Sequence, residues 1–170
     1  MAAVVQAIAF FVFPLGLAFA AANDLLTMTI SNKLTLGLVV LFVVLAPITG
    51  MDLRAFGMHW AAGGIVLAAA FACFAFGWIG GGDAKFAAVA TLWVGWENAL
   101  DFIGLASIFG GALTLLILLF RRSVLPAFII RQPWVQRLHK EKAGVPYGVA
   151  LAAAGLVVYP HTVWATMTIG

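Results

Sequence analysis

Long apolar stretches, separated by short polar or glycine-rich breaks, run along almost the whole chain. A helix that crosses the hydrocarbon core of a bilayer needs roughly 20 apolar residues, because each helical residue rises about 1.5 Å. The pattern predicts six membrane-spanning helices, of which the fourth is the shortest: Val4–Ala22, Leu34–Thr49, Met58–Ile79, Ala84–Trp96, Phe102–Phe120 and Val145–Thr168. We therefore expect an all-α membrane protein, a six-transmembrane-helix bundle that forms one domain over residues 1–170.

The composition excludes an ordinary soluble domain. Hydrophobic residues make up 65% of the chain and charged residues only 9%, whereas soluble domains are about one quarter charged. No Lys or Arg precedes the first apolar run, so we expect a retained span rather than a signal peptide. The single cysteine, Cys73, excludes an intrachain disulfide and a thiolate metal cluster. The three histidines form no closely spaced pair, and we expect neither a metal nor another cofactor.

The basic residues are distributed unevenly between the breaks. With six antiparallel spans, Arg54 falls on one side of the membrane. The other basic residues all fall on the opposite side: Lys33, Lys85, Arg121, Arg122, Arg131, Arg137, Lys140 and Lys142. Loops rich in Lys and Arg stay in the cytoplasm, which predicts a protein with both termini outside, N-out/C-out. Because the net charge of +3 is concentrated beside apolar spans, it favours membrane orientation over nucleic-acid binding.

The longest connection, at about 121–144, combines apolar residues with Trp134 and several arginines. Tryptophan at headgroup depth and arginine on lipid phosphates are typical of an interfacial segment. We therefore predict an interfacial cytoplasmic loop that contacts membrane lipid.

Two of the acidic residues stand out once each acid is assigned to a side of the membrane. The topology assigns three to outer loops and one to a solvated, charge-balanced position between lysines: Asp52, Glu97, Asp101 and Glu141. Asp24 and Asp83 follow the first and third spans, so both are expected at the cytoplasmic face. Two carboxylates at one depth can share a proton, as in aspartic proteases. The alternative is that each aspartate only caps a helix or marks a loop.

The segment Gly80-Gly81-Gly82-Asp83-Ala84-Lys85 favours the chemical interpretation. Glycines at a helix end allow another backbone to approach closely, and a protease must hold an extended substrate by main-chain hydrogen bonds. Lys85 has three candidate roles, which are to tune the charge of Asp83, to orient substrate, or to anchor the helix at the membrane face.

Three segments together resemble the type IV prepilin peptidases, a branch of the GxGD intramembrane aspartic proteases. Gly80-x-Gly82-Asp83 followed by Lys85 is similar to the GxGD-x-K motif. Asp24, followed by Ile30-Ser31-Asn32, is similar to the first motif, in which Ser31 replaces the usual proline. Pro146-Tyr147-Gly148 is similar to the Pro-Tyr-Gly element that starts the last helix.

This resemblance implies that Asp24 and Asp83 are catalytic and that Gly80, Gly82, Lys85, Asn32 and the Pro146-Tyr147-Gly148 element support them. It implies a bacterial inner-membrane enzyme, with its active site toward the cytoplasm, that cleaves pilin precursors between a charged leader and an apolar helix. The short form resembles the peptidases of Flp/Tad-type pili. Because the chain has one cysteine and no four-cysteine zinc module at its N-terminus, we do not expect methyltransferase activity. A homo-oligomer is possible.

Two other classes remain open. A signal-peptide-peptidase type would use the same chemistry, but it carries Pro-Ala-Leu where this chain has Pro146-Tyr147-Gly148. A small proton- or ion-coupled transporter would bind cations with its two carboxylates. Such transporters often have repeated halves, and no convincing repeat is present in this sequence.

Overall fold

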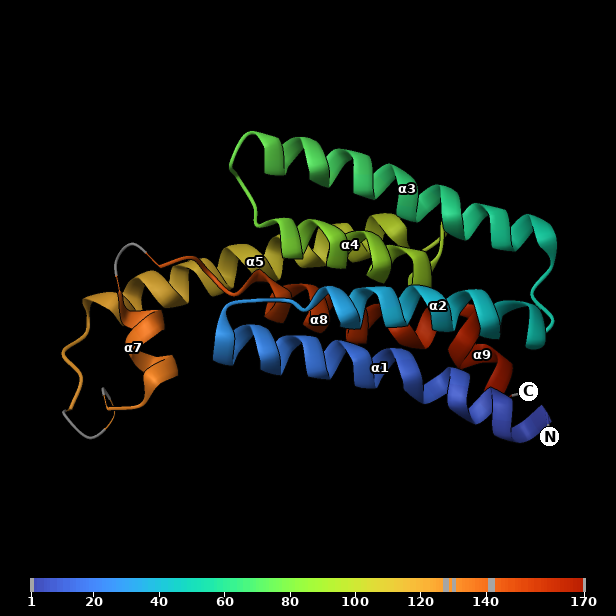
Figure 1. Ribbon diagram of the computed structural model, residues 1–170, viewed down its shortest axis with the longest axis horizontal. Helices are drawn as coiled ribbons and strands as arrows, with labels where there is room; N and C mark the ends of the chain where they lie inside the picture. Colours follow the sequence, from blue (N-terminus) through green and yellow to red (C-terminus); the bar gives the residue numbers. More distant parts are fainter. Residues whose placement is uncertain (1, 127–128, 130, 141–142, 170) are drawn as a thin grey trace.

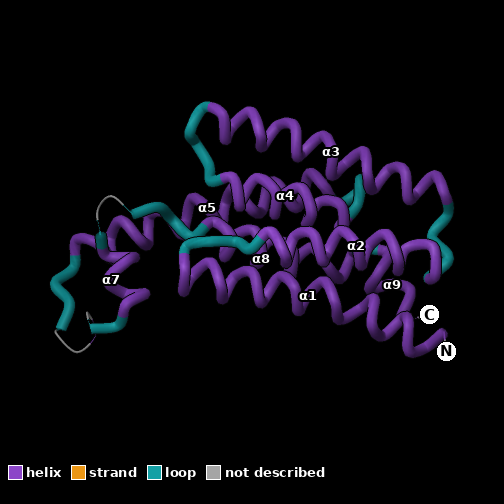
Figure 2. The backbone as a smooth tube through the Cα atoms, in the orientation of Figure 1, coloured by secondary structure: helices purple, strands orange, loops and turns teal. Residues whose placement is uncertain are grey.

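The chain runs back and forth along one long axis as a series of helices (Figure 1). The structure, a computed structural model, describes residues 2–126, 129, 131–140 and 143–169, and side chains from 4 to 166 within these ranges. The elements are α1 (Ala2–Thr27), α2 (Asn32–Ile48), α3 (Leu53–Ala75), α4 (Gly81–Val94), α5 (Ala99–Arg122), α7 (Pro133–His139), α8 (Tyr147–Val158), the 3-10 helix η1 (Tyr159–His161) and α9 (Val163–Ile169). Among the described residues there is no strand (Figure 2), so the all-α prediction is confirmed there.

Three of these helices have the length and apolar character to cross a membrane. They are α1 from Val4 onward, α3 and α5. The helix α2 and the segment Tyr147–His161 are apolar but shorter, and the 14 residues of α4 rise only about 21 Å. The chain is therefore a multi-pass membrane protein, while the bundle of six crossings stays a prediction.

Helix α1 continues past the predicted end of the first span at Ala22. It ends at Thr27, where Met28 takes the left-handed conformation with φ 57°. The N–H of Met28 donates to the carbonyl of Asp24 at 2.7 Å, which satisfies one of the carbonyls left free at a helix end. The prediction that Asp24 follows the helix is wrong, because the residue lies within its last turns.

The connection between α3 and α4 also differs from the prediction. Helix α3 ends at Ala75, and Gly77 then adopts a φ of 75° that a residue with a side chain rarely takes. The predicted third span ran to Ile79, but Trp78 and Ile79 lie in the loop. Asp83 lies in the first turn of α4 rather than before the helix.

The predicted last span, Val145–Thr168, is not one continuous helix. It divides into α8, η1 and α9. Pro160 lies in η1, and a proline within a helix removes one hydrogen bond and collides with the preceding turn. The apolar run therefore continues while the helix breaks.

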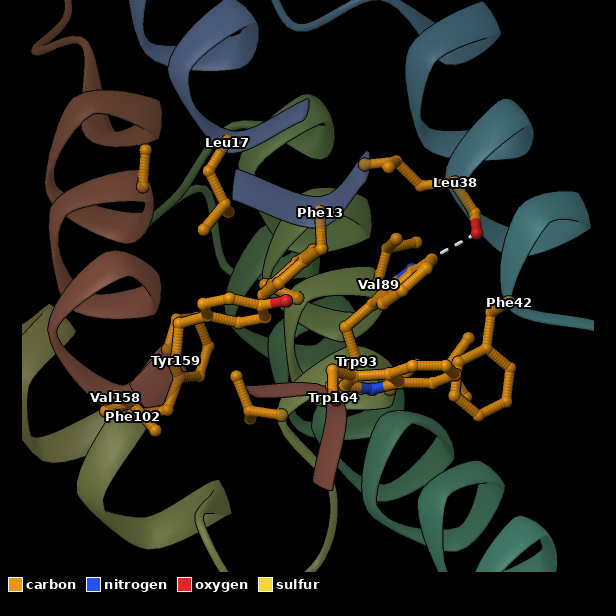
Figure 3. Close-up of a cluster of buried hydrophobic side chains, with 14 of the residues drawn as sticks. Phe13, Leu17, Leu38, Phe42, Val89, Trp93, Phe102, Val158, Tyr159 and Trp164 are labelled. Atoms are coloured by element: carbon orange, nitrogen blue, oxygen red, sulfur yellow. Dashed lines mark hydrogen bonds between the residues drawn. The ribbon is translucent and has the colours of Figure 1, made fainter. Parts of the chain in front are cut away.

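Helix α4 is the centre of the packing, since every residue from Ala88 to Val94 is buried. Trp93 stacks on Phe13 of α1 at 5.3 Å between ring centroids and lies 4.8 Å from Trp164 of α9 (Figure 3). The Trp93 indole N–H donates to the Leu38 carbonyl of α2 at 3.1 Å. A buried indole needs such an acceptor, so this cluster orients α4 against three other helices.

The arrangement of the helices brings the two aspartates to the same end of the molecule. Figure 1 shows the start of α1 and the helix α9 at one end, and the α1–α2 and α3–α4 connections at the other. Asp24 belongs to the end of α1 and Asp83 to the start of α4. Two antiparallel passes through α2 and α3 therefore return the chain to the level of Asp24.

Candidate active site

A cleft of about 860 Å³ lies where α1 ends and α4 begins. Three segments line it: the end of α1 with its following loop, the loop before α4 with its first turn, and the segment that leads into α8. Most of the predicted site residues line this cleft, namely Asp24, Asn32, Gly80, Gly82, Asp83, Lys85 and Tyr147. The other two, Pro146 and Gly148, are buried at the start of α8.

Asp24 is held by the first turn of α8. Its side chain is only 4% exposed, and its Oδ2 accepts a hydrogen bond from the backbone N–H of Gly148 at 2.7 Å. A methyl group on Gly148 would lie 2.8 Å from the same oxygen. Any larger residue at position 148 would therefore force Asp24 or a neighbouring side chain to move.

Asp83 occupies the third position of α4, where an acidic side chain can reach back to the start of the helix. Its carboxylate accepts a hydrogen bond from the N–H of Gly80, the residue that caps α4. Asp83 lies outside the three candidate membrane spans. Burial raises the pKa of this carboxyl to about 6, the charge of Asp24 adds to the rise, and the Gly80 hydrogen bond opposes it. The negative charge of Asp24 therefore disfavours ionisation of Asp83.

The glycines before Asp83 lie close to two other segments of the chain. A Cβ added to Gly82 would lie 3.5–3.6 Å from the backbone and Cβ of Ile30, in the loop after α1. A Cβ on Gly81 would lie 3.3 Å from the ring of Phe74. Gly80 and Gly82 also line the cleft. The loop after α1 therefore lies against the start of α4, where a single added carbon on Gly82 would make ordinary van der Waals contact.

Lys85 connects the two aspartate-bearing segments. Its Nζ donates to Oδ1 of Asn32 at 3.2 Å, across 53 positions of sequence. The side chain is exposed, so the bond by itself contributes little stability. This contact gives Lys85 a role beyond the three considered from the sequence, which is to join the start of α2 to the start of α4.

Ser31 occupies the position where the resembling motif has proline. Its φ of −67° and ψ of 131° are angles that proline adopts readily. The serine caps α2, and its Oγ accepts from the N–H of Lys33 at 3.2 Å. The replacement therefore keeps the extended backbone of the motif and adds a helix cap.

Tyr147 is fixed by helix α5. Its hydroxyl lies 3.2 Å from Oγ1 of Thr114, and its ring packs on Gly110, where an added Cβ would come within 2.7 Å. Sequence patterns did not single out Thr114. Its partner could not be inferred, because the two residues are 33 positions apart and meet only through helix packing.

Sequence reasoning also missed part of the cleft lining. Trp78 and Ile79 line the cleft beside the glycines, and Gly144 and Val145 line it from the side of α8. The signal for the first pair was Gly77, which together with the following glycine triplet marks a loop rather than the end of a span.

The other acids that the structure describes lie elsewhere. A separate cavity of about 370 Å³ is lined by Asp52, His59 and Glu97, from the α2–α3 and α4–α5 ends of the helices. Figure 1 shows these connections at the end opposite to the Asp24 cleft. His59 is buried, and its Nδ1 donates to the Leu92 carbonyl at 2.7 Å, which is a structural contact between α3 and α4.

The comparison with protein families agrees with this geometry. A model of the type IV leader peptidase family matches residues 11–115, more than half of the chain. The matched range includes both cleft aspartates and ends before the Pro146-Tyr147-Gly148 element. No curated protein and no solved structure gives a significant match. The chain belongs to the type IV leader peptidase family, whose members are aspartic prepilin peptidases.

Proposed function

We propose that this enzyme removes the short leader from Flp-type prepilins at the cytoplasmic membrane face, with Asp24 and Asp83 as its catalytic pair. The observation that carries the proposal is that both carboxylates line one cleft and that the charge of Asp24 acts on Asp83. Family membership supports a prepilin as the substrate, and the resemblance to the short peptidases supports the Flp type.

The two carboxyl groups take different parts in the proposed reaction. In the proposal Asp24 is the ionised partner, because its negative charge acts on Asp83 and raises the pKa of that carboxyl; the Gly148 N–H donates to Oδ2 of Asp24. It accepts a proton from water as the water attacks the peptide carbonyl. Asp83 carries the proton and donates a hydrogen bond to the carbonyl oxygen, where negative charge develops. The raised pKa of Asp83 supports this assignment.

The supporting residues shape the cleft in the proposal. Gly80 and Gly82 leave the backbone before Asp83 open to an extended substrate, which main-chain hydrogen bonds would hold. Asn32 and Lys85 contact each other between the start of α2 and the start of α4, beside Asp83. Tyr147 lines the cleft from the side of α8, with Pro146 and Gly148 buried beside it and Gly148 donating its N–H to Asp24.

The proposed topology is a bundle of six crossings in one domain, with both termini outside. It is supported by the basic residues, since Lys33, Lys85 and Arg121 belong to helix ends on the side of the Asp24 cleft and Arg54 to the opposite end. The loop 121–144 would lie at the lipid interface on the cytoplasmic side. Lys142 and Glu141 lie outside the described residues. The scissile bond would then be the junction of a cytoplasmic leader and a membrane-embedded helix.

Family membership favours a peptidase over the transporter alternative, because a peptidase family matches the range that contains both aspartates. It does not support a signal-peptide-peptidase type either. The Pro146-Tyr147-Gly148 element supports the same choice.

The test is co-expression with a candidate prepilin, followed by measurement of the size shift that leader removal causes. Asp24→Asn and Asp83→Asn should each reduce cleavage by at least about a thousandfold, since the two carboxyls act as one unit. Both variants should remain in the membrane at normal levels. Processing at a near-normal rate by either variant would refute the assignment of the pair.

The matched controls are Asp52→Asn and Asp101→Asn. Both residues are exposed and lie at the ends of helices remote from the cleft. These variants should process the precursor at rates close to wild type. Loss of cleavage in a stably folded control would contradict the proposed sidedness.

A further inference from the structure

The segment between α5 and α8 is held by an arginine that the proposed chemistry does not use. Arg121 lies in the last turn of α5. Its Nε donates to the carbonyl of Leu138 at 2.8 Å, and its Nη2 donates to the carbonyls of Ala143 and Gly144, each at 2.8 Å. One planar guanidinium thus joins the end of α7 to the segment that enters α8, a geometry suited to arginine's fixed fork of donors.

These contacts bear directly on the cleft. Gly144, which Arg121 holds, and Val145, which follows it, both line the cleft. Gly148 comes shortly afterwards, and its N–H is the donor to Asp24. A shift of the segment at Gly144 would therefore move a wall of the cleft and the hydrogen-bond donor of a proposed catalytic carboxylate.

A second arginine ties the same segment to the other side of the cleft. Arg137 of α7 donates through Nη2 to the carbonyl of Leu26, in the last turns of α1. Carbonyls at a helix C-terminus lack partners within the helix and carry partial negative charge, so a cation is favoured there. Val135 and Leu138 of α7 are buried and anchor this short helix. Leu26 lies close to Asp24 in sequence, on the helix that carries it.

We propose that Arg121 and Arg137 are positioning residues that set the place of Asp24 and of the Gly144–Gly148 wall for cleavage. This inference rests on the proposed function, because its kinetic test measures prepilin cleavage. Together with α7 the two arginines form a clasp from the end of α5 to the end of α1. Both arginines and α7 lie outside the range that the family model matches.

Arg122 provides the matched control. It is the neighbouring arginine in the same last turn of α5, and its side chain is exposed. Arg121→Ala and Arg122→Ala each remove one positive charge from the same face of the membrane. A difference between the two variants therefore reports the contacts of Arg121 rather than the loss of charge.

The kinetic test measures kcat and KM for prepilin cleavage by the full-length enzyme in proteoliposomes. Displacement of a reacting group by about 1 Å can cost roughly a hundredfold in rate. Arg121→Ala should therefore lose about ten- to a hundredfold in kcat/KM, and kcat itself should decrease. Arg122→Ala should stay within about twofold of wild type, and Arg121→Lys should fall between, since lysine keeps the charge without the planar fork. Arg121 and Arg137 act on one clasp, so the double alanine variant should lose less than the product of the two single losses.

Amide hydrogen exchange of the peptide that contains Ala143–Gly148 gives a readout independent of cleavage. Local opening should be faster in Arg121→Ala than in Arg122→Ala, while the exchange of α4 stays unchanged. Equal exchange and equal kcat/KM in the two folded variants would overturn the inference. If wild-type enzyme cleaves no prepilin, the proposed function fails, and faster exchange confined to Ala143–Gly148 would still support the clasp.

Discussion

Asp24 and Asp83 are both aspartates at helix ends, yet their surroundings differ. Asp24 is almost fully buried and accepts the N–H of Gly148, a residue from a helix far away in sequence. Asp83 is partly exposed and accepts the N–H of Gly80, a residue of its own helix start. Two similar carboxyls in unlike surroundings are the condition under which one ionises while the other keeps its proton.

The raised pKa of Asp83 leads to a prediction about its protonation. Carbodiimides react with protonated carboxyl groups, so modification of Asp83 should decline as the pH rises through about 6 in the wild-type enzyme. Removing the neighbouring charge in Asp24→Asn should shift the midpoint to lower pH, because a nearby negative charge disfavours a second one. Peptide mass spectrometry after labelling at a series of pH values measures both midpoints. A wild-type midpoint near 4, or one that Asp24→Asn leaves unchanged, would contradict the coupling.

At the scale of single helices, the start of α8 is the element that meets the end of α1. Helix α8 begins at Tyr147 after Pro146, and its first backbone N–H groups have no partner within the helix. One of these, the N–H of Gly148, takes Asp24 as its acceptor. The contact thus satisfies a helix terminus and orients a carboxylate at the same time.

The variant Gly148→Ala tests this junction. The new methyl group would lie 2.8 Å from both Oδ2 of Asp24 and Cδ1 of Ile30, so one of them must move. We expect cleavage to fall by about a hundredfold and the free energy of unfolding to fall by about 1–3 kcal/mol. Precursor processing and thermal unfolding in detergent measure the two effects.

The control for this variant is Gly111→Ala in α5, where an added Cβ meets nothing within 4 Å. Alanine is a better helix former than glycine by roughly 1 kcal/mol, so this variant should be as stable as wild type or more so and should cleave normally. Normal cleavage by Gly148→Ala would show that the position of Asp24 tolerates the added methyl group.

Helix ends are also where the sequence was least informative. The hydrophobic pattern located each long apolar helix, but it placed Asp24 after α1 and Asp83 before α4, and both lie inside the helices. The reason is that hydropathy reports the apolar character of the side chains and not the hydrogen bonding of the backbone. The ends are set by Met28 and Gly77 in left-handed conformations and by the break at Pro160, which a hydropathy profile does not record.

At the scale of the whole molecule, the α1–α2 and α3–α4 connections, which line the Asp24 cleft, lie at one end, and α9 and the start of α1 lie at the other (Figure 1). The proposed orientation directs the cleft toward the cytoplasm. Arg54 follows the start of α3 and Lys33 follows the start of α2, and both side chains are exposed at opposite ends.

Single-cysteine labelling tests this orientation. In a Cys73→Ser background, a membrane-impermeant maleimide added to intact spheroplasts should label Arg54→Cys at once. Lys33→Cys should react only after permeabilisation, since the positive-inside rule assigns its loop to the cytoplasm. The reverse pattern would place the cleft on the outer face and end the proposal of cytoplasmic leader removal.

The sequence alone determined the membrane character, the family motifs and the two aspartates to consider, because apolar length and short local motifs are properties of neighbouring residues. The tertiary structure decided which distant groups meet: Gly148 on Asp24, Lys85 on Asn32, and Arg121 on the segment that enters α8. These contacts join positions far apart in the chain, and they depend on how α4 and α8 pack against α1 and α5. Local patterns carry no record of that packing, which explains why Gly144 and Val145 of the cleft lining were missed while the two acids were found.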